Sequence, residues 1–147
     1  MFPHTVTVYV TITETDLTTM KDVEKHYITV LKGVLLVASK AKNVNESGLE
    51  GADAVNLYIP LSVDARDANT GAAQTYTGAV EWWRTEDKSA LWTLSNTGNC
   101  FFVKGEHVHY DLPVQTIKAM YDDVYNVTKI DLLDFGDAMA HLEVGGA

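Results

Sequence analysis

A chain of 147 residues with a formal net charge of −9 is long enough for one domain with a buried core. It is too acidic to hold nucleic acid by neutralising phosphates. The single cysteine, Cys100, excludes an intrachain disulfide and any CxxC metal or redox motif. The sequence shows no signal-peptide pattern and no apolar run of bilayer length, so we expect a protein made and folded in the cytoplasm.

The N-terminal third predicts two strong strands. Residues 5–13 alternate valine and isoleucine with threonine and tyrosine, the period of a strand with one buried face. Residues 14–25 are polar and predict a long loop or the tip of a long hairpin. Residues 26–37 predict a second strand, with Gly33 at a bulge or bend that would help a sheet to curl.

The middle of the chain mixes a strand, a loop and an aromatic segment. Residues 54–59 predict a strand with Val55, Leu57 and Ile59 facing inward and Pro60 ending it. Residues 64–75 are small and polar and predict a second long loop. Residues 76–92 are aromatic-rich and are broken by a turn at 86–89.

The last third predicts a hairpin, one helical turn and a final strand pair. Residues 91–94 and 100–103 are separated by a loop of hairpin length. Pro113 precedes a helical turn over 114–121. Residues 122–146 predict two strands joined by a turn at 134–137. The last strand alternates inward and outward residues from Ala138 to Val144.

Together these segments predict an all-β protein: a small barrel or sandwich of roughly seven to nine short antiparallel strands, with at most one short helix. Neither an internal repeat nor a low-complexity segment is visible in the sequence. We therefore expect residues 1–147 to form a single barrel-like domain with long loops near 14–25 and 64–75.

His107 and His109 form an HxH pair. Residues two apart in a strand point to the same face, so both imidazoles could reach one metal ion. A third ligand would have to come from His141, His26 or Asp111, and nothing in the spacing supplies it. The simpler interpretation is a pair of surface histidines.

Two other features have both a chemical and a structural interpretation. The acidic residues of the C-terminal segment could provide an acid–base pair or a calcium loop, or could form turns and keep the protein soluble. These residues are Asp122, Asp123, Asp131, Asp134 and Asp137. Cys100 could be a nucleophile if His107 or His109 lay across a hairpin, but its apolar neighbours favour a buried structural thiol.

Trp82, Trp83 and Arg84 form the possible interface. If they lie in a strand, one tryptophan enters the core and the other faces outward beside the arginine. An exposed tryptophan beside an arginine is typical of a protein interface and could also stack on a sugar. The alternative is that loops cover both rings.

The sequence contains none of the GxxxxGK[ST], GxSxG, GxGxxG or HExxH motifs. We therefore predict no enzyme activity, no catalytic residues, no cofactor and no bound metal.

Several short segments resemble a family of small structural proteins of tailed phages and prophages, mostly from Gram-positive hosts. The clearest is the ending Asp134-Phe135-Gly136 followed by His141-Leu142-Glu143-Val144-Gly145-Gly146, which resembles a DFG…HWEVGG pattern with leucine in place of tryptophan. Residues 1–7, 51–60 and 91–106 also resemble that family. The resemblance runs the length of the chain and includes no catalytic signature.

The resemblance implies a head-completion or head–tail connector protein, such as a stopper. Such a protein would form a ring in the neck of the virion, with itself, portal or adaptor proteins and tail terminator proteins as partners. DNA would pass through without sequence recognition, and no membrane would be involved. The protein would be found in the bacterial cytoplasm during assembly and then in the virion. An alternative is a tail or other virion component with a ligand- or carbohydrate-binding surface at Trp82 and Trp83.

Overall fold

The computed structural model describes residues 2–38, 55–96, 99–134 and 140–147. Its elements in chain order are β1 (His4–Asp16), β2 (Lys21–Ala38), β3 (Val55–Pro60), β4 (Asp64–Asp67), β5 (Thr75–Tyr76), α1 (Ala79–Arg84), β6 (Leu91–Trp92), β7 (Asn99–Lys104), α2 (Val114–Met120), β8 (Val124–Leu133) and β9 (His141–Gly146). Nine strands in the described residues confirm the all-β prediction. The prediction of at most one helix is wrong, because α1 and α2 are both present.

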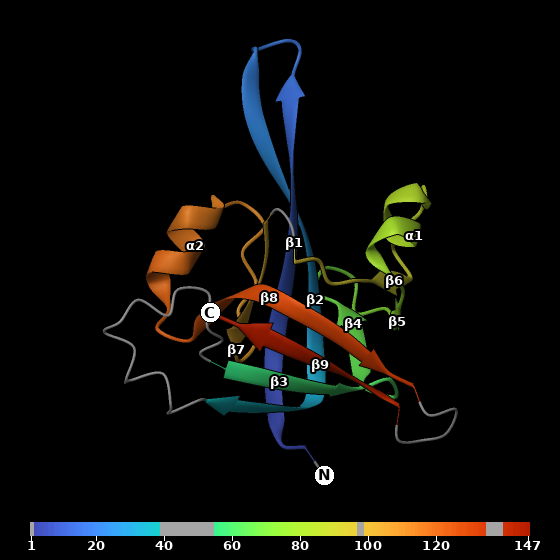
Figure 1. Cartoon of the computed structure of the whole chain (residues 1–147). Helices are drawn as coiled ribbons and strands as arrows, with labels where there is room; N and C mark the ends of the chain where they lie inside the picture. Colours follow the sequence, from blue (N-terminus) through green and yellow to red (C-terminus); the bar gives the residue numbers. More distant parts are fainter. Residues whose placement is uncertain (1, 39–54, 97–98, 135–139) are drawn as a thin grey trace.

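Six strands pair in a closed cycle, so the sheet curls into a barrel-like ring (Figure 1). The order is β1, β7, β8, β9, β3, β2 and back to β1, and every pair in the cycle is antiparallel. The short β4 adds to β2 beside the ring. The predicted barrel-or-sandwich class is therefore confirmed.

Gly33 divides β2 into two pairing segments. Residues 29–32 pair with β4, and residues 35–38 pair with β3. Gly33 has φ of 97°, a backbone conformation open to glycine and strained for other residues. The predicted bend at Gly33 therefore exists, and it directs the last part of β2 toward β3 to close the ring.

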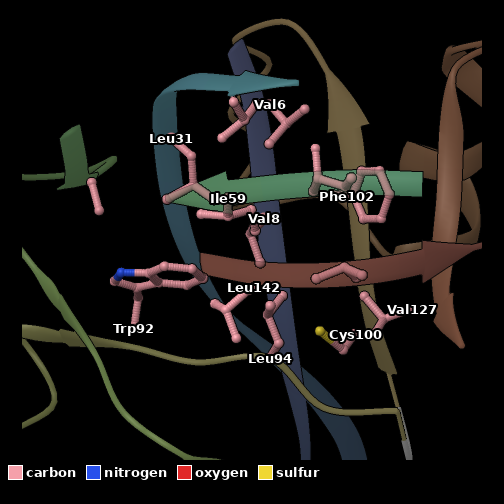
Figure 2. Close-up of a cluster of buried hydrophobic side chains, with 14 of the residues drawn as sticks. Val6, Val8, Leu31, Ile59, Trp92, Leu94, Cys100, Phe102, Val127 and Leu142 are labelled. Carbon is pink, nitrogen blue, oxygen red and sulfur yellow. The ribbon is translucent and has the colours of Figure 1, made fainter. Parts of the chain in front are cut away.

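The interior of the ring is filled by the alternating apolar residues of its strands. Val6, Val8 and Val10 of β1 face inward, as the sequence pattern predicts, and Val55, Leu57 and Ile59 of β3 face them across the barrel. Figure 2 shows Val6, Val8 and Ile59 converging with side chains from other strands. The same cluster includes Leu31, Trp92, Leu94, Cys100, Phe102, Val127, Leu142 and Val144.

A second apolar cluster lies on the outer face of β1, β2 and β7. Tyr9, Ile28 and Phe101 are buried there against Val114 and Ile117 of α2. This confirms the helical turn predicted over 114–121, and it explains why β1 has two buried faces. The threonine and tyrosine face of β1 is covered by α2 and by the segment that precedes it.

The predicted loop at 14–25 is instead the paired end of the β1–β2 hairpin. The register continues from Thr13↔Glu24 to Asp16↔Lys21, so only residues 17–20 form the turn. The hairpin alternative is therefore confirmed and the loop alternative is wrong. The β1–β2 pairing that begins in the barrel continues without a break, so these polar residues extend the two strands. We call residues 13–24 the arm; it projects beyond the barrel and past both helices (Figure 1).

The loop predicted at 64–75 also has regular structure. Residues 64–67 form β4, and the Asp67 carboxylate accepts hydrogen bonds from the Asn69 backbone N–H (3.1 Å) and the Thr70 hydroxyl (3.1 Å). An isolated bridge joins Arg66 to Ala73. Small polar residues here form a tight turn at the sheet edge rather than a long loop, because aspartate and threonine side chains replace missing backbone partners.

The hairpin predicted between residues 91–94 and 100–103 is wrong. β6 pairs in parallel with β5, and β7 lies between β1 and β8. Both edges of β7 are needed to close the ring, so no edge remains for its neighbour in sequence. Trp92 and Leu94 turn into the barrel interior instead, where both are buried.

Candidate functional site

The segment Trp82-Trp83-Arg84 lies in helix α1, so the strand prediction for it is wrong. The helix has six residues, too few for a helical period to be recognised in the sequence. Glu81 lies in its first turn and Arg84 in its last, each at the end where its charge is favoured by the helix dipole. Neighbouring residues in a helix still point in different directions, and the predicted split between one buried and one exposed tryptophan is confirmed.

Trp82 is only 1% exposed and anchors α1 to the barrel. Its ring contacts the edge of Tyr27 at 5.0 Å between centroids, and Lys88 Nζ lies 5.1 Å above it. The backbone carbonyl of Thr85 accepts a hydrogen bond from Lys88 Nζ, which holds the lysine over the ring. A ring enclosed in this way is not available for stacking on a sugar.

Trp83 is the exposed member of the pair, with 55% of its surface accessible. It meets Trp82 edge to face at 5.6 Å, so its ring is held at a fixed angle to the helix. Trp83 and Val80, which is 66% exposed, lie three residues apart and form a small apolar face on α1.

A cavity of about 330 Å³ lies between the barrel, α1 and the segment that follows it. Its walls combine aromatic rings, among them Tyr27, Trp82 and Trp92, with polar groups. Two of these polar groups already bond each other, because the Thr29 hydroxyl donates to Gln74 Oε1 at 2.7 Å. Lys25 and Lys88 also line it, and each lies over an aromatic ring.

His107 and His109 lie in an irregular segment, not in the strand on which their pairing was predicted. Both rings contact Tyr121. The His107 ring lies at a tilt of 31° to the Tyr121 ring, 4.3 Å between centroids, and His109 Nε2 forms a hydrogen bond with the Tyr121 hydroxyl. The segment is irregular because side chains, not a neighbouring strand, satisfy its backbone. Thr7 Oγ1 accepts from the His107 N–H at 3.0 Å and donates to the Gly105 carbonyl at 2.7 Å.

Tyr9 holds the same segment from the barrel side. Its hydroxyl donates to the His107 carbonyl at 2.5 Å and accepts from the His109 N–H at 3.1 Å. The ring stacks on Phe101 at 4.7 Å and is fully buried. Burial raises the pKa of the Tyr9 hydroxyl to about 12.

This raised pKa predicts an alkaline loss of stability. The unfolded chain releases the Tyr9 proton near pH 10, while the folded chain keeps it until about pH 12. Stability therefore falls as pH rises between these values, by up to about 3 kcal/mol. Tyr9→Phe lacks this ionisation, so the difference in unfolding free energy between wild type and variant should shrink from pH 8 to pH 11 in urea titrations. A difference in unfolding free energy that stays constant from pH 8 to pH 11 would contradict this prediction.

The other metal ligands considered from sequence lie elsewhere. His26 Nε2 donates to the Leu112 carbonyl at 2.6 Å, which leaves Nδ1 to accept from Thr11 Oγ1 at 2.8 Å. His141 Nε2 is 3.1 Å from a Glu143 carboxylate oxygen, and Asp111 is exposed. Within the described ranges, no three His, Cys, Asp or Glu side chains come close enough to share a metal ion.

The acidic residues of the C-terminal segment that the structure describes do not form one cluster. Asp122 and Asp123 precede β8, and Asp131 and Asp134 lie at its other end, roughly 30 Å along the strand. Asp131 pairs with Lys129 at 3.3 Å, and Asp123 accepts a hydrogen bond from the Tyr125 hydroxyl at 3.1 Å. Asp137 and most of the predicted 134–137 turn lie outside the described residues. Residues at opposite ends of β8 are too far apart to act together as one acid–base pair.

Cys100 points into the barrel and is 3% exposed. Burial raises the pKa of its thiol to about 11, and its sulfur accepts a hydrogen bond from the Ser95 N–H at 3.4 Å. A protonated, enclosed thiol is a poor nucleophile. These facts agree with the structural interpretation of this cysteine.

The tip of the arm is the surface that sequence reasoning missed. Leu17 is 84% exposed, Met20 74% and Val23 50%. Met20 also has φ of 57°, in the left-handed region that a methionine rarely adopts. The turn is shaped by Asp16, whose carboxylate accepts from the Thr18 N–H at 2.8 Å and whose carbonyl accepts from the Met20 N–H at 2.7 Å. In the sequence, Leu17 and Met20 are two large apolar residues within a polar stretch, and this contrast could have indicated the exposed surface.

These features define a small all-β protein with a barrel-like ring, two covering helices and a projecting arm. The chain belongs to a family of unknown function, DUF6751, whose profile matches residues 3–147. Searches of curated proteins and of solved structures returned no significant match. Neither helix in the described part of the chain has the length and apolar character needed to cross a membrane.

Proposed function

We propose that this protein is a non-catalytic virion assembly protein, a head-completion or head–tail connector component in the neck of a tailed phage. In that role it forms a ring between portal or adaptor proteins and the tail. The observation that carries an assembly role is the arm tip, where Leu17 and Met20 are large, apolar and exposed.

The arm tip contributes nothing to the chain's own core. Exposed apolar residues at the end of a projecting ribbon bury little surface within the described structure, and such residues mark contact with another molecule. Met20 adds a local cost, because a non-glycine residue at positive φ is strained by roughly 1 kcal/mol or more. A turn selected for stability alone would have glycine or asparagine at this position.

The neck assignment is supported by the sequence resemblance of residues 1–7, 51–60, 91–106 and the C-terminal ending to phage structural proteins. The net charge of −9 is compatible with a ring through which DNA slides without adhering. The protein would accumulate in the host cytoplasm and end in the virion.

Stability and assembly should separate in a variant of the arm tip. The double substitution Leu17→Thr with Met20→Gly should leave the free energy of unfolding unchanged or raise it by up to about 1 kcal/mol, because it removes strain and no core contact. Association with portal and adaptor proteins should be lost, as measured by co-sedimentation of the co-expressed proteins. A variant that still co-sediments like wild type would contradict a docking role for the tip.

Mass spectrometry of purified phage particles tests the neck assignment itself. We expect the protein in intact particles at a fixed ratio to the portal protein. Its absence from particles that contain portal and tail proteins would overturn the assignment, even if the arm were shown to bind something else.

Trp83 favours one second candidate, a virion component that binds a glycan. Only Trp83 could stack on a sugar, because Trp82 is enclosed. A glycan array should then give binding that Trp83→Ala abolishes, and the absence of binding to any glycan would remove this candidate.

A further inference from the structure

Both edges of the arm are open in the part of the chain that the structure describes. β7 pairs with β1 only over Val6–Thr11, and β4 pairs with β2 only over Thr29–Lys32. Beyond these points, no other strand among the described residues pairs with the arm. A two-stranded ribbon with two open edges presents backbone donors and acceptors on which another strand can add.

Two hydrogen bonds near the barrel show which residues direct their backbone groups outward. The Thr5 carbonyl accepts from the Gly105 N–H at 2.7 Å on the β7 side, and the Ile28 carbonyl accepts from the Ala68 N–H at 3.0 Å on the β4 side. Because backbone groups alternate between the two edges of a strand, the outward-facing residues in the arm follow from these two positions. They are Thr13 and Thr15 on the β1 edge, and Asp22 and Glu24 on the β2 edge.

Charge decides which edges can meet. Two β1 edges around a twofold axis would place Glu14 opposite Glu14, and two β2 edges around Val23 would place Lys21 opposite Lys25 and Asp22 opposite Glu24. Like charges opposite each other destabilise a strand pair. A β1 edge against a β2 edge instead repeats the pairing inside the hairpin, in which Asp16 is opposite Lys21 and the Thr15 hydroxyl bonds Asp22 at 3.0 Å.

We infer that the arms of neighbouring copies pair with each other, the β1 edge of one copy with the β2 edge of the next. Thr13 lies opposite Glu24 of the next copy, and Thr15 opposite Asp22. If neighbouring copies are related by rotation about an axis parallel to the arms, equivalent residues lie at the same position along that axis. This symmetry therefore gives the same register. The register also places outward-facing residues opposite each other. Such head-to-tail contacts close into a ring, and the inference rests on the assembly role proposed above.

Single cysteines in separate chains test this pairing. In the inferred register Glu14 faces Val23 of the next copy in a non-hydrogen-bonded pair, for which Cα atoms lie about 4.5 Å apart and a disulfide can form. Glu14→Cys chains and Val23→Cys chains are purified in full length, mixed at high concentration and oxidised. A disulfide between the two variants can only join different chains.

We expect a disulfide-linked dimer in the mixture and none in either variant alone. Glu14→Cys mixed with Thr18→Cys serves as the matched control and should give none, because Thr18 lies in the turn. Native Cys100 is buried and should not react. Disulfide-linked homodimers of either variant alone would show a twofold pairing of identical edges instead. The absence of any dimer in the mixture would overturn the inference. These purified chains report on arm pairing alone, while particle composition reports on the neck assignment.

Discussion

Deleting residues 138–144 is expected to leave a chain that does not fold to a soluble protein. The deletion removes most of β9, which pairs with β3 on one edge and β8 on the other. Leu142 and Val144 are 0% and 1% exposed, so the core loses two fully buried side chains. Opening the ring would also expose two long strand edges, which invite aggregation.

The close packing at the end of β9 adds to this expectation. At Gly146 an added Cβ would lie 2.9 Å from Phe102 Cζ and 2.9 Å from Tyr125 Cβ, so the strand lies directly against its neighbours. Leu142→Ala should cause a smaller loss of stability than the deletion. We expect its free energy of unfolding, measured by urea titration, to be lower than that of wild type by about 2–5 kcal/mol. A soluble, folded deletion variant would show that β9 is a docking tail and not a core strand.

A deletion of similar size in the arm is the matched control. Residues 15–22 are removed, and Glu14 is joined to Val23 through Asn-Gly, which favours a two-residue hairpin turn. Because this part of the arm contributes nothing to either core cluster, the shortened chain should remain soluble with an unfolding midpoint close to wild type. Failure of this variant to fold would mean that the arm is needed for the fold itself.

Trp82→Ala is expected to destabilise the protein by about 3–5 kcal/mol, the range for truncating a large buried aromatic side chain. Trp82 is 1% exposed and joins α1 to Tyr27 and to Lys88, so the variant would enlarge the neighbouring cavity and release the helix. For a chain of this size the unfolding midpoint should fall by roughly 6–20 °C, measured by circular dichroism.

The neighbouring position provides the control for Trp82. Trp83 lies on the same helix and is 55% exposed, so Trp83→Ala should change the free energy of unfolding by less than about 0.5 kcal/mol. Equal effects of the two substitutions would contradict the assignment of Trp82 as the anchor of α1.

The strands with strict alternation were predictable from sequence, and the reason is local. The valines of β1 and the apolar residues of β3 and β9 repeat every second residue, and burial of one face fixes which residues point inward. The bend at Gly33 was predictable too, because a glycine within a strand pattern has few other roles.

The parts that sequence could not predict depend on long-range pairing. The six residues of α1 carry no readable period, and their strand-forming residues favour the wrong structure. His107 and His109 sit where Thr7 and Tyr9 bind the backbone of their segment, contacts across about a hundred positions of sequence. The arm was ambiguous because its strand pairing depends on the barrel from which it extends.

Complementation tests whether the arm joins this protein to its neighbours in the proposed phage neck. If the gene belongs to a phage, as proposed, cells that produce this phage without its own copy of the gene are supplied with either the full chain or the shortened-arm chain, and particles are counted by electron microscopy. We predict joined heads and tails with the full chain, and separate heads and tails with the shortened chain. Joined particles with the shortened chain would show that the arm is not needed to join heads to tails.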